Sequence, residues 1–158
     1  MRRLLKFLHT IGAIGLMGAM AALLAVVWFA PEPASVAAEA AVAVAMGQIA
    51  TWVFLPSLAL TLIAGLLAIA VTPGYHDAGW VWAKAATGIL IFEGGFLYVL
   101  GPMQAVAKAS ASALAGQLDP TILTGSYGSE RNTLWVLLAV AAANVALGVW
   151  RPRLQFPV

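Results

Sequence analysis

Residues 1–30 read MRRLLKFLHTIGAIGLMGAMAALLAVVWFA, a basic start followed by an apolar run. From residue 7 to residue 29 the run carries one ionisable side chain, that of His9. A helix rises about 1.5 Å per residue, so about 20 apolar residues cover the ~30 Å hydrocarbon core of a bilayer. The run is also longer than the roughly 7–15-residue apolar core of a signal peptide. This stretch therefore predicts a membrane-spanning helix.

The composition of the whole chain agrees with a membrane protein. Of its 158 residues, 63% are hydrophobic and only 9% are charged, whereas soluble domains average about 25% charged residues. The length fits a single domain over residues 1–158. Cysteine is absent, which excludes disulfides, thiolate metal sites and iron–sulfur ligation. The net charge of +2 is too small to indicate a nucleic-acid partner, and no hydrolase or nucleotide-binding motif occurs. Whether the protein is an enzyme stays open.

Prolines and polar turns divide the chain into four predicted spans, at about residues 5–29, 40–71, 80–100 and 133–150. Ser35 is predicted to cap the second helix, and Pro56 is predicted to bend it because proline lacks a backbone donor. Residues 103–118 are rich in Ala and Ser, and we expect them to form a helix that lies along the outer surface. The predicted fold is an all-α integral membrane four-helix bundle.

The basic residues predict how the spans are oriented, because cytoplasmic loops carry an excess of Lys and Arg. With both termini inside, the cytoplasmic side holds Arg2, Arg3, Lys6, Lys84, Arg151 and Arg153, and the outer side holds Lys108 and Arg131. The opposite topology would reverse this ratio. We therefore expect an N-in, C-in multi-pass protein of a bacterial inner membrane.

His9 is the first candidate site residue. It lies about one turn inside the cytoplasmic boundary, and an ionisable side chain within a membrane helix is a functional-site hypothesis by default. Gly12, Gly15 and Gly18 follow at a spacing of three and clear a strip that a neighbouring backbone or a flat cofactor can approach. Two interpretations remain open. Either His9 is a ligand, or it hydrogen-bonds a neighbouring helix and the glycines serve helix packing.

Lys84 and Asn144 are predicted to lie at the depth of His9. By helix rise, both fall in the inner third of the membrane, where side chains of an antiparallel bundle can meet in the core. Lys84 taken alone also fits a lysine that extends to the inner interface. Glu93 lies about 20 Å beyond Trp80. We expect its side chain to face the bundle. There it either forms a structural hydrogen bond or has a proton-relay or quinone-binding role.

Two short motifs resemble a bacterial superfamily. They are LLKFLHTIG at residues 4–12 and WAK at residues 82–84, which opens the third span. The superfamily includes the membrane-bound protoporphyrinogen oxidase family, the copper-resistance D family and small predicted integral membrane proteins of unknown function, and the chain is most similar to the last group. In the oxidase branch the first-helix histidine is regarded as a ligand of haem b and the third-helix lysine as part of the same site. The resemblance implies these roles for His9 and Lys84.

The resemblance also has a limit. The residues that follow the histidine read AIGLM at positions 13–17 and depart from the oxidase branch, which argues against protoporphyrinogen oxidation. The leading hypothesis is a membrane redox subunit in which His9 is the metal ligand of haem b, with Lys84 and Asn144 in the binding site and another membrane subunit or quinone as the electron donor. A ligating histidine gives its other N–H to an acceptor, which we expect on another helix, for example Asn144.

The rival hypothesis belongs to a different class. It is a cofactor-free accessory subunit that packs against a larger membrane complex. Under either hypothesis the expected partners are the lipid bilayer and either other membrane subunits or further copies of the chain in a homo-oligomer. A third hypothesis, copper handling, is disfavoured because only Met and His ligands are present and no loop is rich in either.

Overall fold

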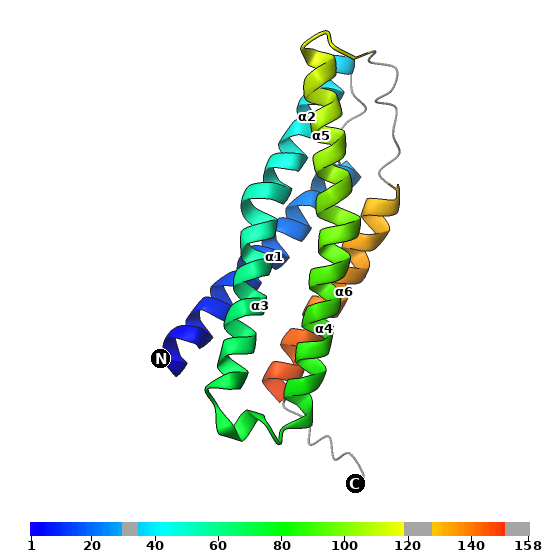
Figure 1. Cartoon of the computed structure of the whole chain (residues 1–158). Coiled ribbons are helices and arrows are strands. Elements are labelled where there is room, and N and C mark those ends of the chain that lie inside the picture. The colour runs from blue at the N-terminus through cyan, green and yellow to red at the C-terminus, as the bar shows by residue number, and fades with distance from the viewer. Residues whose placement is uncertain (30–34, 119–127, 151–158) are drawn as a thin grey trace.

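The computed structural model describes residues 1–29, 35–118 and 128–150, and nearly all of them are helical (Figure 1). Helix α1 spans Arg2–Phe29 and α6 spans Gly128–Trp150. Two longer helical rods lie between them. The first consists of α2 (Val36–Ile49), η1 (Ala50–Phe54) and α3 (Leu55–Ala70), and the second of α4 (Gly79–Gly95), η3 (Phe96–Leu100) and α5 (Gly101–Leu114). A 3-10 turn, η2 (Pro73–Tyr75), connects the rods.

Within the described residues, four helices are long and apolar enough to cross a membrane: Arg2–Phe29, Val36–Ala70, Gly79–Leu114 and Ser129–Trp150. The predicted all-α class and its four apolar helices are therefore confirmed. Ser35 caps α2 as predicted, since its Oγ accepts a hydrogen bond from the Ala38 amide at 3.2 Å.

We call the end of the molecule where α1 begins the proximal end and the opposite end the distal end.

The helices pack in three main pairs, with α1 along α3, α4 along α6 and α2 along α5. The core lies where the two rods meet α1 and α6. Its fully buried large side chains are Met20, Leu23, Met46, Phe54, Leu58, Val99, Met103 and Leu134. At the distal end α2 and α5 extend beyond the ends of α1 and α6 (Figure 1). The 35 residues of the first rod measure about 52 Å, which exceeds the ~30 Å hydrocarbon core.

The prediction that residues 103–118 form a separate helix along the outer surface is wrong. Helix α5 continues α4 and packs lengthwise against α2. Small side chains explain this packing, because a Cβ on Gly47 of α2 would collide with the Cβ of Ala107 on α5. The Ala and Ser content that made this segment look weakly apolar allows two helices to approach closely along their length.

Each rod accommodates its proline with one widened turn. Pro56 and Pro102 have no backbone N–H, so the regular ladder cannot continue through them. Just before each proline the helix forms a π turn, in which Leu55 N–H donates to the Ala50 carbonyl and Gly101 N–H to the Phe96 carbonyl. The two π turns contact each other. Nearby, Gln104 Nε2 donates to Thr51 Oγ1 at 3.0 Å and joins the two rods.

Aromatic side chains gather at both ends of the apolar region, as is usual at membrane interfaces. At the distal end the Trp28 and Trp135 rings meet edge to face at 6.3 Å, and the Arg131 guanidinium lies 5.4 Å from the Trp28 ring centroid. At the proximal end Tyr75 and Trp80 meet edge to face at 5.8 Å. Each pair joins two different elements at its end of the molecule.

Candidate functional site: a cavity between four helices

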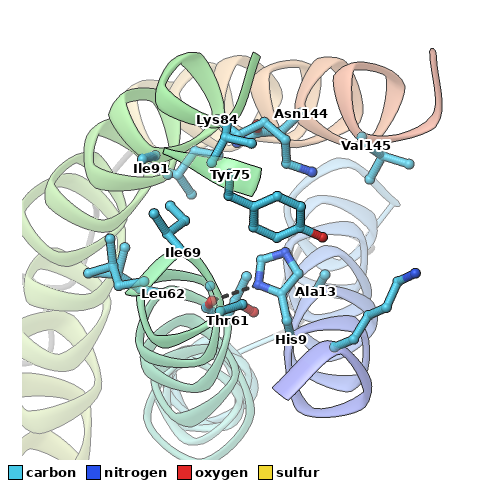
Figure 2. A pocket seen from close by; sticks show the side chains of 18 of the residues that line it. His9, Ala13, Thr61, Leu62, Ile69, Tyr75, Lys84, Ile91, Asn144 and Val145 are labelled. Carbon is cyan, nitrogen blue, oxygen red and sulfur yellow. Dashed lines mark hydrogen bonds between the residues drawn. The ribbon is translucent and has the colours of Figure 1, made fainter. Parts of the chain in front are cut away.

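A cavity of about 380 Å³ opens in the proximal half of the molecule. Such a volume lies in the range of roughly 300–1,000 Å³ typical of ligand and cofactor pockets. Its inner walls are mostly apolar, with Leu16, Leu58, Leu62 and Ile91 among the lining side chains. Helices α1, α3, α4 and α6 all contribute to it, and Tyr75 reaches it from η2 (Figure 2). The cavity therefore depends on how the helices pack and belongs to no single element.

His9 lines this cavity with its ring held in place. Its Nδ1 lies 2.8 Å from the Thr61 carbonyl oxygen on α3 (Figure 2). A carbonyl only accepts hydrogen bonds, so Nδ1 carries the hydrogen and, in the neutral ring, Nε2 keeps a lone pair. Nε2 forms no hydrogen bond with the described part of the chain. The acceptor comes from another helix, as expected, but it is Thr61 and not Asn144.

Glycines on α1 and α3 shape the surroundings of the imidazole. Side chains of α3 occupy the space beside Gly12 and Gly15. A Cβ on Gly12 would lie 2.5 Å from Thr61 Oγ1, and one on Gly15 would collide with Ser57 Oγ. The glycine strip of α1 therefore serves packing against α3. The glycine that makes room for the imidazole is Gly65 on α3, where a Cβ would lie 3.1 Å from His9 Nδ1.

Lys84 and Asn144 line the same cavity as His9, so the structure brings together the three residues selected from the sequence. Figure 2 shows His9 and Thr61 on one side and Lys84 and Asn144 on the opposite side. Lys84 reaches from α4 to α6, where a Cβ on Gly148 would lie 2.6 Å from its Nζ. The Asn144 Oδ1 atom is buried and has no hydrogen-bond partner among the described residues.

The cavity is lined by cations and lacks acids. Arg2, Arg3 and Lys6 line it at its proximal end, and Lys84 lies among the helices. Arg2 is tied to the rim, because its Nε donates to the Val71 carbonyl at 3.3 Å. No Asp or Glu belongs to the lining within residues 1–29, 35–118 and 128–150. The site is therefore complementary to a ligand that has an apolar body and an acidic end.

In the described part of the chain, no three His, Cys, Asp or Glu side chains gather at one point. The cavity offers a single imidazole, so a bare metal ion would find one side-chain ligand of these kinds there. A metal carried inside a macrocycle needs the protein to supply only axial ligands. One imidazole is enough for an axial position, and His9 supplies one to the cavity.

Two further ionisable residues, His76 and Glu93, lie outside the cavity. His76 is exposed, and its Nε2 lies 3.0 Å from the Ile69 carbonyl, as befits a loop residue. Glu93 is also exposed, so the prediction that it faces the bundle is wrong. Its neighbours Gly94 and Gly95 take the inward positions instead, and consecutive helix residues point about 100° apart.

Sequence reasoning missed several contributors to the site. The Thr61 carbonyl leaves no signal in a sequence, because every residue has one. Tyr75 lay in a predicted turn, and no pattern showed that the turn closes the cavity. Arg2 and Arg3 were assigned only to topology, although a signal for a second role exists. They lie on the same helix as His9, within two turns of it, and point to the same end of the molecule.

Compared with protein-family models, with curated proteins and with solved structures, the chain matches none.

Proposed function

We propose that this protein is a small membrane redox subunit that holds a b-type haem in the proximal cavity, with His9 as an axial ligand. The observation that carries the proposal is the hydrogen bond from His9 Nδ1 to the Thr61 carbonyl, since it leaves Nε2 unbonded in a large apolar cavity. When bound, a haem supplies one-electron chemistry at its iron. The chain supplies the ligand, the apolar walls and the charges.

Each part of the cavity has a role in this proposal. The Thr61 carbonyl fixes the tautomer and the orientation of the imidazole and raises its basicity as a ligand. The space beside Gly65 lets the ring keep that orientation. Arg2, Arg3 and Lys6 bind carboxylates at the proximal mouth, where charge-assisted hydrogen bonds are strong. The apolar walls exclude water and lower the local dielectric constant, and both effects would tune the redox potential of the bound haem.

We also propose that the proximal end faces the cytoplasm, so that both termini lie inside. The three basic residues at the start of α1 and Lys84 near the start of α4 lie at this end, whereas Lys108 and Arg131 lie in the distal half. The positive-inside rule places the more basic end in the cytoplasm. The carboxylate-binding mouth of the cavity would then open toward the cytoplasmic interface of a bacterial inner membrane.

The test is the visible spectrum of protein expressed with an adequate supply of haem precursor. We expect the difference between reduced and oxidised samples to show the sharp bands of a b-type haem, in an amount stoichiometric with the chain. His9→Ala should give an inserted, folded protein without these bands. The matched control is His76→Ala, which changes the exposed loop histidine and should keep the haem.

A second pair of variants tests the cations. Lys84→Met should lower haem retention, while Lys108→Met on the exposed face of α5 should leave it unchanged. A wild-type protein without haem, or a His9→Ala protein that binds as much haem as wild type, would contradict the proposal. The cofactor-free accessory subunit would then be the better description.

A further inference from the structure

Asn144 on α6 lines the cavity with its hydrogen-bonding capacity unused. Its Oδ1 atom is buried without a partner, and its Nδ2 atom forms no hydrogen bond with the described residues. An amide group in apolar surroundings costs free energy when its hydrogen bonds are not made. A group of this kind needs a partner, and the structure places it in the wall of a cavity of ligand size.

The contacts between α4 and α6 give the depth of Asn144. The two helices run antiparallel, since α4 begins at the proximal end and α6 ends there (Figure 1). Gly94 of α4 meets Leu137 of α6, because a Cβ on Gly94 would lie 3.2 Å from Leu137 Cδ2. Two helical turns nearer the proximal end, this register brings Gly88 and Asn144 to one level.

His9 lies at that level on the other side of the cavity. A Cβ on Gly88 would lie 3.9 Å from Leu62 Cδ1 on α3, and the residue before Leu62 is Thr61, whose carbonyl accepts the hydrogen bond from His9. The depths of Asn144 and His9 therefore agree to within about one turn. Figure 2 shows the two side chains on opposite sides of the cavity.

The wall that faces His9 offers an amide but none of the usual haem ligands. Among the described residues, α4 and α6 contribute no His, Met, Cys or Tyr to the lining, and these are the usual axial ligands of haem proteins. Lys84 of this wall reaches Gly148, which lies one turn beyond Asn144 toward the proximal end. Asn144 is thus a polar group of this wall at the depth of the imidazole.

We propose that Asn144 hydrogen-bonds a small exogenous molecule at the axial position of the haem opposite His9. This role rests on the proposed haem binding. Its ligand is a small molecule that binds iron through one atom and accepts a hydrogen bond through another, as cyanide and molecular oxygen do. The Nδ2 group of Asn144 would donate that bond. The hydrogen-bond donors and the access on this side of a haem determine whether it binds small molecules or transfers electrons.

Carbon monoxide tests whether this axial position is open. The haem content of protein expressed with haem precursor is first measured from the reduced-minus-oxidised spectrum. We then expect the reduced wild-type protein to bind carbon monoxide, with a shift of its main absorption band. Wild-type protein that contains haem but takes up no carbon monoxide would show a closed position. That result would overturn this proposal and leave haem binding intact.

A comparison of two ligands isolates the hydrogen bond of Asn144. Carbon monoxide is a weak hydrogen-bond acceptor and cyanide is a strong one. In Asn144→Leu, which has nearly the same shape, the affinity of the oxidised protein for cyanide should fall about twofold to tenfold, the effect of one lost hydrogen bond. Its haem content and its affinity for carbon monoxide should stay unchanged. The matched control is Asn132→Leu, at an exposed position near the distal end of α6, which should bind both ligands as wild type does.

The remaining outcomes would overturn the role of Asn144. Unchanged cyanide affinity in Asn144→Leu would show that no hydrogen bond is lost, and an equal fall for both ligands would show a steric effect. Loss of haem from this variant would show that Asn144 holds the haem itself. Wild-type protein without haem would contradict the proposed function and this role together.

Discussion

The Nδ1–H group of His9 on α1 donates to the carbonyl oxygen of Thr61 on α3 at 2.8 Å, across 52 positions of sequence. This bond links two helices that pack along each other and both form part of the cavity wall. It determines which ring nitrogen carries the hydrogen and which one opens to the cavity. The position of a backbone carbonyl on one helix thus sets the chemistry that a side chain on another helix can offer.

Gly65 is predicted to be required for this arrangement. A Cβ at Gly65 would lie 3.1 Å from His9 Nδ1 and 3.2 Å from Cε1, so Gly65→Ala should shift the imidazole by a few tenths of an ångström and disturb its hydrogen bond to Thr61. Loss of an orienting arrangement around a ligating histidine typically costs about tenfold or more in affinity. We expect a comparable fall in haem affinity, measured by titrating apoprotein with haem.

The control for Gly65 lies outside the cavity. A Cβ on Gly18 of α1 would have no heavy atom within 4 Å. Gly18→Ala should therefore bind haem as wild type does. If the two variants bind haem equally well, the space beside Gly65 is not what positions His9.

The contact between α2 and α5 is predicted to be intolerant of added volume. At Gly47 an added methyl group would collide with Ala107, so Gly47→Ala should destabilise the protein by about 1–3 kcal/mol, as overpacking commonly does. Thermal unfolding of the purified protein in detergent measures this. The comparison is Gly18→Ala on α1, where nothing lies within 4 Å of the added atom. That variant should be neutral or slightly stabilised, because alanine favours a helix over glycine by about 1 kcal/mol.

Topology is testable with reporters. A reporter fused after Val158 should behave as cytoplasmic, and one inserted directly after Gly116, beyond the end of α5, should behave as external. The reason is the excess of basic residues at the proximal end, together with four helices that are long and apolar enough to cross a membrane. A reporter at Val158 that is external would show that both termini are not inside. Equal behaviour of the two positions would show that the two sites lie on one side of the membrane.

The cavity residues show how far sequence reasoning reached. His9, Lys84 and Asn144 were placed at one depth by counting residues from the predicted ends of their helices, and the structure puts all three around one cavity. Depth is predictable because helix rise is constant at about 1.5 Å per residue. The four apolar helices were predictable for a related reason, since length and hydropathy alone decide what can cross a membrane.

Rotation of each helix about its axis was not predictable. Glu93 is predicted to face inward, but its side chain faces outward. The glycine strip of α1 packs against α3, and the glycine that makes room for His9 is Gly65 on α3. In a soluble protein the contrast between apolar core and water fixes which side of a helix is buried. Here lipid and protein interior are both apolar, so the sequence carries little of that contrast.

The all-α class, the number of apolar helices and the depth of each polar side chain along its helix can be read from the amino-acid sequence. Which side chains face each other, that Thr61 holds His9, and that α5 extends α4 instead of turning onto a surface become known only from the packing of the helices. The difference arises because hydropathy and helix rise are properties of a local segment. The rotation of each helix about its axis, and the helix against which it packs, depend instead on contacts between segments that are distant in the chain. Small residues such as Gly12 and Gly47 make these close contacts possible.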